Sequence, residues 1–440
     1  MNDIYIKRRK RLLDKIDEGI IFIPSASLKN RSNDTDFPFR QNTDFYYFTG
    51  FSEYNSILVL SKKKDQIKSI IYVEKKDPTL ELWTGTRTGA EKAKEILSTD
   101  DSFNIEEFDR QLAGLLEGHS NVYIDHYLHQ TWRKQIFNVS SNLWNQRKKP
   151  NHVPAHFHHL NVLTDEMKLY KDEFEIAQIK KASTLSLKAH LAVMAYAKVG
   201  ANERDLEALL FYFFKQNLGG GPAYDPIVAS GENANILHYV KNNETLKDGD
   251  LVLVDAGAEY GLYASDITRT FPVNGKYSDA QKKVYEIVLA AQNQAIQNAI
   301  PGSTLKDVHT TASLTLIEGL IELSILKGNK EDLFKSEKHR QYYPHGTGHW
   351  LGLDVHDQCP YLDKNLDEIK LSDGMVFTVE PGIYLPSNDE NIPKEFRGVG
   401  IRIEDDLLIT KDGNENLSQQ IPKTIDAVEE ACGKDFKNYI

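Results

Sequence analysis

The sequence predicts two domains, an α/β domain over residues 1–165 and an α+β domain over residues 166–440. The chain has 440 residues, which is more than one hydrophobic core usually organises. Short strand-like and helical runs alternate in its first part, whereas long helices and antiparallel strand-like runs fill its second part. Between them, residues 142–165 contain a basic stretch, two prolines and several histidines, so we expect the domain boundary there.

The first domain is predicted to be α/β from its pattern of apolar residues. Apolar runs typical of strands cover residues 19–26, 55–60, 68–73 and 121–126. Helical spacing of apolar residues predicts helices near 7–16, 90–97, 108–116 and 129–137. No Gly-rich phosphate-binding loop follows any of these strands, so the pattern does not indicate a nucleotide-binding domain.

The second domain is predicted to mix antiparallel strands with flanking helices. A long amphipathic pattern starts at residue 171 and a second helix is expected from residue 203. The runs LVLVDAG and SDITRTF are strand-like, and the short connection between them favours an antiparallel hairpin. Further helices are expected at 280–299 and 305–326, and strands dominate from about residue 374 to 410.

Composition excludes several classes of function. Hydrophobic residues make up 40% and charged residues 27%, as in folded globular proteins rather than disordered chains. The net charge of −11 argues against nucleic acid or an anionic membrane as partner. With only two cysteines, a disulfide framework or thiolate metal cage is not expected. The charged N-terminal stretch resembles no signal peptide and no run of about 18 apolar residues occurs, so we expect a cytoplasmic protein.

Two groups of residues could suggest a metal site or a nucleic-acid site, but each is better explained as ordinary surface structure. His152, His156, His158 and His159 lie in the expected linker without acidic residues or cysteines at ligand spacing, which favours an exposed connection that binds no metal. The basic patch at residues 7–11 belongs to an otherwise acidic chain, so a solvated helix face is expected rather than a nucleic-acid site.

Four acidic residues in apolar strand contexts form a more informative group. Asp255 ends the run LVLVD, where a buried carboxylate is costly unless it is paired. Asp266 follows eleven residues later, and across a hairpin the two carboxylates could face each other with a cation between them. Glu380 in FTVEPG and Glu404 in GIRIEDD repeat the pattern.

The group favours a metal site when it is considered as a whole. A single acid at a strand end is usually a cap or surface residue, and a single histidine such as His349 in a Gly-rich stretch is usually a turn residue. Four carboxylates together carry a charge of −4, which two divalent cations would neutralise and one would not. The sequence therefore predicts a site for a pair of divalent cations.

The motifs LVDAG, SDITRTF, HGTGHWLGLDVHD, TVEPGIY and GIRIEDD, in this order, resemble the aminopeptidase P and prolidase group of pita-bread metallopeptidases. Upstream, SGENANILHY and FRQNTDFYYFTGF are more similar to aminopeptidase P than to prolidase. The resemblance covers nearly the whole chain. It implies a creatinase/ribonuclease H-like N-terminal domain and a pita-bread (creatinase/aminopeptidase) catalytic domain of the family M24B type.

The resemblance also implies how the ligands divide between two metal ions. Asp255 would bind one ion, His349 and Glu380 the other, and Asp266 and Glu404 would bridge both. All five positions are filled, unlike those of relatives that kept the fold and lost peptidase activity. The resemblance implies manganese as the metal. Oxygen ligands with one imidazole agree with a hard cation, although cobalt or zinc could occupy the same ligands.

Three residues are implied in catalysis by the same resemblance. Two cations lower the pKa of a shared water, which then attacks a carbonyl carbon. Glu380 would pass a proton from this water to the leaving nitrogen, and His238 and His356 would stabilise the tetrahedral intermediate. From the sequence alone, each histidine would first be interpreted as structural.

Five further residues are expected to contact the substrate. His345 would line the pocket for the residue after the cleaved bond, Arg402 would hold the substrate beyond that bond, and Tyr384 would lie nearby. Both have a purely structural alternative: Tyr384 could be a core tyrosine, and Arg402 could belong to a surface ion pair. Tyr224, in the Gly-rich segment before His238, is a possible contact. Trp83 resembles a residue that reaches a neighbouring subunit's active site, the alternative being an isolated exposed tryptophan.

The predicted function is an Xaa-Pro aminopeptidase, which releases the N-terminal residue from peptides with proline in second position. Two alternatives stay open at this point: a prolidase restricted to Xaa-Pro dipeptides, and a binding module that uses the fold without turnover. The expected partners are peptides and further copies of the chain, as a homodimer or homotetramer.

Overall fold

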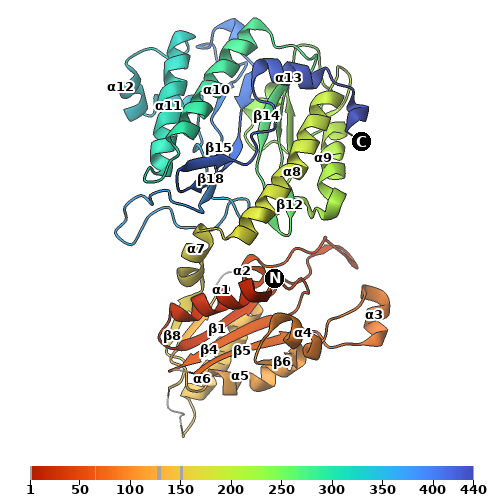
Figure 1. Ribbon diagram of the computed structural model, residues 1–440, viewed down its shortest axis with the longest axis vertical. Coiled ribbons are helices and arrows are strands. Elements are labelled where there is room, and N and C mark those ends of the chain that lie inside the picture. Colours follow the sequence, from red (N-terminus) through yellow and green to blue (C-terminus); the bar gives the residue numbers. More distant parts are fainter. Residues whose placement is uncertain (1, 65, 126–129, 149–151, 440) are drawn as a thin grey trace. The chain divides into compact units, whose positions relative to one another are not determined.

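The computed structural model describes residues 2–64, 66–125, 130–148 and 152–439. These form two compact units, Met1–Met167 and Lys168–Ile440, and the division falls within helix α7 (Asn161–Leu169). Figure 1 shows both units along the chain. Among the described helices, none combines the length and the apolar character that crossing a lipid bilayer requires.

The first unit is built on a mixed six-stranded sheet with the order β6-β5-β4-β1-β7-β8. Antiparallel pairs join β1 to β4 and β4 to β5, whereas β5–β6, β1–β7 and β7–β8 are parallel. The strands are β1 (Gly19–Pro24), β4 (Ile57–Lys63), β5 (Gln66–Val73), β6 (Asp101–Asn104), β7 (Asn121–Ile124) and β8 (His156–His159). A separate two-stranded ribbon consists of β2 (Asn30–Ser32) and β3 (Thr35–Asp36).

Helices cover both faces of this sheet, as the alternation of apolar residues requires. Ile20 and Phe22 of β1 share a core with α5 and α6, and the intervening residues of the strand point to the face contacted by α1, α2 and α4. The helices of this unit are α1 (Asn2–Asp14), α2 (Thr43–Thr49), α3 (Pro78–Thr84), α4 (Ala90–Leu97), α5 (Phe108–Leu116) and α6 (Gln130–Trp144). The predicted α/β character of the first domain is confirmed.

The prediction that residues 142–165 form a histidine-rich linker is wrong for three of its four histidines. His156, His158 and His159 belong to β8, which pairs in parallel with β7 at the edge of the sheet. The His158 ring stacks on Tyr123 with centroids 4.7 Å apart, and its Nε2 lies 2.9 Å from Asn121 Oδ1. Local composition indicated a loop here because the pairing depends on a strand more than 30 residues earlier in the chain. Residue 129, the expected start of α6, lies outside the described residues.

The second unit contains several small antiparallel sheets. One has the order β10-β11-β14, a second β13-β12-β9 and a third β15-β18-β19, while β16 pairs with β17. The strands are β9 (Gly221–Pro222), β10 (Ile227–Ser230), β11 (Leu251–Asp255), β12 (Ala258–Tyr260), β13 (Tyr263–Ala264), β14 (Thr268–Pro272), β15 (Val376–Val379), β16 (Gly382–Leu385), β17 (Val399–Arg402), β18 (Asp405–Thr410) and β19 (Gly413–Asn416).

Two pairs of long helices enclose these strands. In Figure 1, α8 and α9 lie on one side of the strands of this unit and α10 and α11 on the other. One large apolar core joins both pairs to β11, β14 and β17. The helices are α8 (Glu173–Tyr196), α9 (Glu203–Lys215), α10 (Asp279–Asn298), α11 (Leu305–Glu322), α12 (Lys330–Lys335) and α13 (Ile425–Cys432). The predicted α+β arrangement is confirmed.

The predicted hairpin forms with a different register from the one expected. β11 and β14 pair antiparallel, but Asp255 is opposite Thr268, and Asp266 lies two residues before β14. The intervening chain is a second hairpin, β12–β13, rather than a simple connection. The two carboxylates therefore do not face each other across the ladder, and other residues must bring them together.

A buried ion pair joins β14 to β18 beside the strand ends. Arg269 and Asp405 are fully buried and form an ion pair of 2.7 Å, to which Lys423 adds a second contact of 2.6 Å. These two cations lower the pKa of Asp405 although burial alone would raise it. Arg269 also donates to the main-chain oxygen of Ile421, so the pair fixes several segments at once.

Asp405→Asn tests how much this ion pair contributes to the stability of the fold. The substitution preserves the shape of the side chain but leaves two cations without their anion, so we expect the free energy of unfolding to fall by about 3 kcal/mol. Urea denaturation measures the change. Glu415→Gln is the control, because its 2.8 Å pair with Lys180 is exposed and should contribute below about 1 kcal/mol. Equal effects of the two substitutions would contradict this assignment.

Candidate active site

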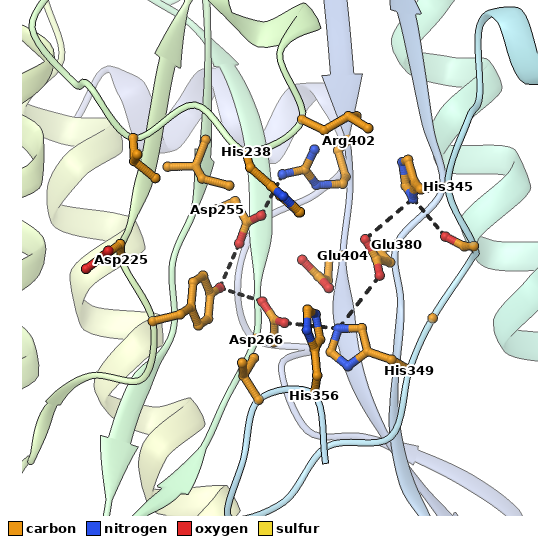
Figure 2. Close-up of a pocket in the computed structure, with 17 residues that line it drawn as sticks. Asp225, His238, Asp255, Asp266, His345, His349, His356, Glu380, Arg402 and Glu404 are labelled. Carbon is orange, nitrogen blue, oxygen red and sulfur yellow. Dashed lines mark hydrogen bonds and ion pairs between the residues drawn. The ribbon is translucent and has the colours of Figure 1, made fainter. Parts of the chain in front are cut away.

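A pocket of about 460 Å³ lies in the second unit at the ends of its strands. Figure 2 shows acidic side chains in its centre, with His238 above them, His345 to their right, and His349 and His356 below them. The pocket collects residues from four separated stretches of sequence, which the fold brings together: Tyr224, Asp225, Ile227, Leu237, His238, Val240, Asp255, Asp266, His345, Gly346, Gly348, His349, Val355, His356, Glu380, Arg402 and Glu404.

The four predicted carboxylates all line this pocket, each from the end of a strand or from within two residues of one. Asp255 ends β11, Asp266 precedes β14, Glu380 follows β15, and Glu404 lies between β17 and β18. Main-chain hydrogen bonds hold two of these positions. The Glu380 N–H donates to the main-chain oxygen of Thr347 at 2.7 Å, and the Glu404 N–H donates to that of Thr268 at 3.1 Å.

Two side chains link the carboxylates to one another. The Tyr224 hydroxyl donates to Asp255 Oδ1 at 2.7 Å and also contacts Asp266 Oδ1. The guanidinium of Arg402 donates to Asp255 Oδ2 at 2.5 Å. The Asp266 main-chain N–H in turn donates to the buried Asp406 carboxylate at 3.1 Å. The tyrosine thus joins the two aspartates that the strand ladder leaves out of register.

His349 presents its Nε2 to the carboxylates. Its Nδ1 lies 3.1 Å from the main-chain oxygen of Trp350, to which it donates, and this bond orients the ring. Nε2 is then 3.3 Å from Asp266 Oδ2 and 3.8 Å from Glu380 Oε1. The preceding Gly348 allows this approach, because a Cβ there would lie 1.9 Å from the main-chain oxygen of Thr378.

Burial dominates the ionisation of the carboxylates. It raises the pKa of Asp255, raises that of Glu380 to about 7, and raises that of Glu404 well above its ordinary value. Burial alone would lower the pKa of His349, but its hydrogen bond to Asp266 and the nearby negative charges raise it to about 9. The side chains of the protein alone therefore supply too little positive charge for so many buried acids.

The donor set fits divalent cations. Ligand atoms of Asp266, His349 and Glu404 all lie within 4.8 Å of one another, and Asp255 and Glu380 contact this group through Tyr224 and His349. Carboxylate oxygens with one imidazole nitrogen suit hard or borderline cations. Such cations would offset the carboxylate charge that burial otherwise disfavours.

A hydrogen-bonded series extends from the carboxylates along one side of the pocket. Arg402 Nη1 donates to the Tyr384 hydroxyl at 2.9 Å, and that hydroxyl donates to His345 Nε2 at 2.8 Å. His345 Nδ1 donates to the main-chain oxygen of Gly346 at 2.7 Å. Burial, together with the charge of Arg402, lowers the pKa of His345 to about 3, so the ring is neutral and its Nε2 accepts the hydrogen bond from the Tyr384 hydroxyl.

The remaining predicted residues have different positions. His238 and His356 line the pocket, and His356 lies edge-on against His349 with ring centroids 4.2 Å apart. Tyr384 lies behind His345 and is not among the lining residues. Trp83 belongs to α3 of the first unit, is 81% exposed, and does not line this pocket.

Two residues of the site, Thr268 and Asp225, are not predicted from the sequence. Thr268 is fully buried, and its hydroxyl donates to Glu404 Oε2 at 2.6 Å and accepts from Arg402 Nε at 3.2 Å. Its position two residues after Asp266 in an alternating strand pattern could have indicated an inward side chain. Asp225 lines the pocket beside Tyr224, and an exposed acid in a Gly- and Pro-rich segment gives no such signal.

Comparison with protein families assigns both units. Residues 177–411 match metallopeptidase family M24, and residues 5–123 match the aminopeptidase P N-terminal domain. The first match lies in the second unit and contains all five predicted ligands. The predicted two-domain architecture, with a pita-bread catalytic domain, is therefore confirmed.

Relatives and solved structures match over nearly the whole chain. The Xaa-Pro aminopeptidases of Haemophilus influenzae and Escherichia coli are both 39% identical, over 96% of this chain and 95% and 96% of their own. Aminopeptidase PepP of Pseudomonas aeruginosa superposes with a TM-score of 0.96 at 36% identity, covering 100% of this chain and 99% of that one. A variant of E. coli aminopeptidase P in complex with substrate gives 0.94 at 37% identity, covering 98% of both chains. The chain therefore belongs to metallopeptidase family M24 and, within it, to the Xaa-Pro aminopeptidases, also called aminopeptidases P.

Proposed function

We infer that this chain is an Xaa-Pro aminopeptidase, a hydrolase that removes the N-terminal residue from peptides with proline in second position. The observation that carries this inference is the gathering of the five expected metal ligands, four carboxylates and the His349 imidazole, in a single pocket of a family M24 fold. The relatives named for this activity match over 96% of the chain, including the N-terminal domain.

The pocket would hold two divalent cations, and we propose manganese. Asp255 would bind one ion, His349 and Glu380 the other, and Asp266 and Glu404 would lie between them. Each of the five side chains lines the pocket with an oxygen or nitrogen donor available. When bound, the ions lower the pKa of a water molecule and polarise the scissile carbonyl group.

Glu380 is the proposed proton carrier. It lies between His349 and His345, with Oε1 3.8 Å from the first and Oε2 3.7 Å from the second. One of its oxygens would accept a proton from the attacking water and release it to the proline nitrogen. The nitrogen needs that proton because it leaves as a secondary amine.

Histidines on two sides of the pocket would hold the substrate. His238 and His356 would contact the carbonyl oxygen as negative charge develops on it. His345, backed by Tyr384 and Arg402, would form the wall that accepts the proline ring. The ring nitrogen has no N–H to donate, so a fitted wall replaces the hydrogen bond that ordinary peptidases make to an amide.

The cellular setting is also proposed. Two free cysteines and no disulfide among the described residues are compatible with a reducing compartment, so we propose that the enzyme acts in the cytoplasm. We also propose a homodimer or homotetramer in which Trp83 contacts another copy of the chain. Its 81% exposure on a short helix with exposed Leu80 and Leu82 favours such a contact.

Peptide hydrolysis separates this function from its alternatives. Purified protein with added Mn²⁺ should release the first residue of Xaa-Pro-Xaa tripeptides, and a chelator should abolish the release. Product analysis by mass spectrometry would measure it. A strict prolidase would cleave Xaa-Pro dipeptides and leave tripeptides intact, whereas a binding module would cleave neither.

Glu380→Gln should lower kcat by about 10²- to 10⁴-fold, since the amide keeps a ligand oxygen but carries no proton between water and nitrogen. Steady-state kinetics on a tripeptide would show the loss in kcat rather than in KM. Glu395→Gln, at an exposed glutamate outside the pocket, is the control. Full turnover in a folded Glu380→Gln protein would refute the assigned role.

Thr268→Val should weaken metal binding. The substitution retains the side-chain shape but removes the hydroxyl that donates to Glu404, so the affinity for Mn²⁺ should fall by about tenfold. Calorimetric titration of metal-free protein measures the affinity. Thr268→Ser retains the hydroxyl and should restore it. If both variants bind Mn²⁺ as tightly as wild type, the threonine has no part in orienting the ligand.

A further inference from the structure

The pocket has two ends with different chemistry. Figure 2 shows His345 at one end, Asp225 at the other, and Asp255 and Asp266 between them. The proposed function, on which the following inference rests, assigns the His345 end to proline. Because the bond is cut at the central carboxylates, the residue before proline must extend toward the Asp225 end.

Apolar side chains line the same pocket as Asp225. They are Ile227, Leu237 and Val240, and Ile227 follows Asp225 by two residues in the sequence, while Tyr224 directly precedes it. Ile227 is only 4% exposed and Val240 is 53% exposed, so the walls run from the interior to the surface. Such a surface suits the methylene groups of a long side chain.

Asp225 differs from the other acids of the pocket in having no partner. Asp255 is paired with Arg402, Asp266 is bound by Tyr224 and His349, and Glu404 accepts from Thr268. Within the described part of the chain, no hydrogen bond or ion pair reaches the Asp225 carboxylate. In Figure 2 this carboxylate is turned away from the central acids. Only a long side chain would extend from the cleaved bond to it.

We propose that this end of the pocket binds a basic N-terminal residue, lysine or arginine. The aliphatic part of the residue packs along Ile227, Leu237 and Val240, and its cationic group pairs with Asp225. Short residues remain substrates because their recognition depends on the central cluster and the proline wall. The preference is moderate, since an ion pair at an exposed position gains about fivefold or less.

Two peptides of equal length measure this preference. Lys-Pro-Ala and norleucine-Pro-Ala carry the same aliphatic chain, and only the first has a side-chain charge. The ratio of their kcat/KM values on wild type should be about three- to fivefold in favour of lysine at low salt. It should decrease toward one as ionic strength rises. Because each ratio compares two peptides on one enzyme, a general change in activity cancels.

Three variants connect the ratio to Asp225. Asp225→Asn should bring it to about one through a higher KM for the lysine peptide, and Asp225→Glu should retain a preference for lysine. Glu244→Gln makes the same change in net charge at an exposed glutamate outside the pocket and should retain the wild-type ratio.

The possible failures are distinguishable. A wild-type ratio of one, or an unchanged ratio in Asp225→Asn, would overturn the basic-residue preference while cleavage of the norleucine peptide supports the aminopeptidase assignment. If wild type with Mn²⁺ cleaves neither peptide, both the proposed function and this inference are wrong.

Discussion

The catalytic unit depends on placing four carboxylates inside one pocket without losing the fold. Burial raises the pKa of Asp255, Glu380 and Glu404, so each acid needs a compensating partner. Arg402 supplies one positive charge, and divalent cations would supply the rest. Divalent cations bound at this site would stabilise the folded protein, which would link occupancy to folding.

The surrounding structure holds the acids by main-chain and side-chain bonds rather than by the strand ladder. Asp255 ends β11 opposite Thr268, whereas Asp266 lies two residues before β14, and the Tyr224 hydroxyl contacts both carboxylates. The Thr268 hydroxyl is hydrogen-bonded to both Glu404 and Arg402. Arg402 also donates to Tyr384, which lies on the side of the pocket assigned to proline. Ligand geometry and substrate recognition therefore share residues, so a change at one affects the other.

The sequence was sufficient for the architecture and for most of the site. Apolar strand runs that end in an acid predicted Asp255, and motif resemblance extended the set to residues that local patterns leave ambiguous, such as His345. Register was not predictable, because the hairpin β12–β13 that displaces Asp266 is stabilised by contacts with distant segments, among them β9. Thr268 and Asp225 were missed because a hydroxyl in a strand and an acid in a loop are common features without chemistry.

The five proposed ligands are spread from Asp255 to Glu404, and this spacing matters while the chain is being synthesised. The first two aspartates leave the ribosome well before β17 and β18, which flank Glu404. Until those strands are made, a nascent or truncated chain carries only part of the ligand set. With the ligands assigned as proposed, an incomplete polypeptide would lack a complete metal site, and hydrolysis would begin only after nearly the entire protein exists.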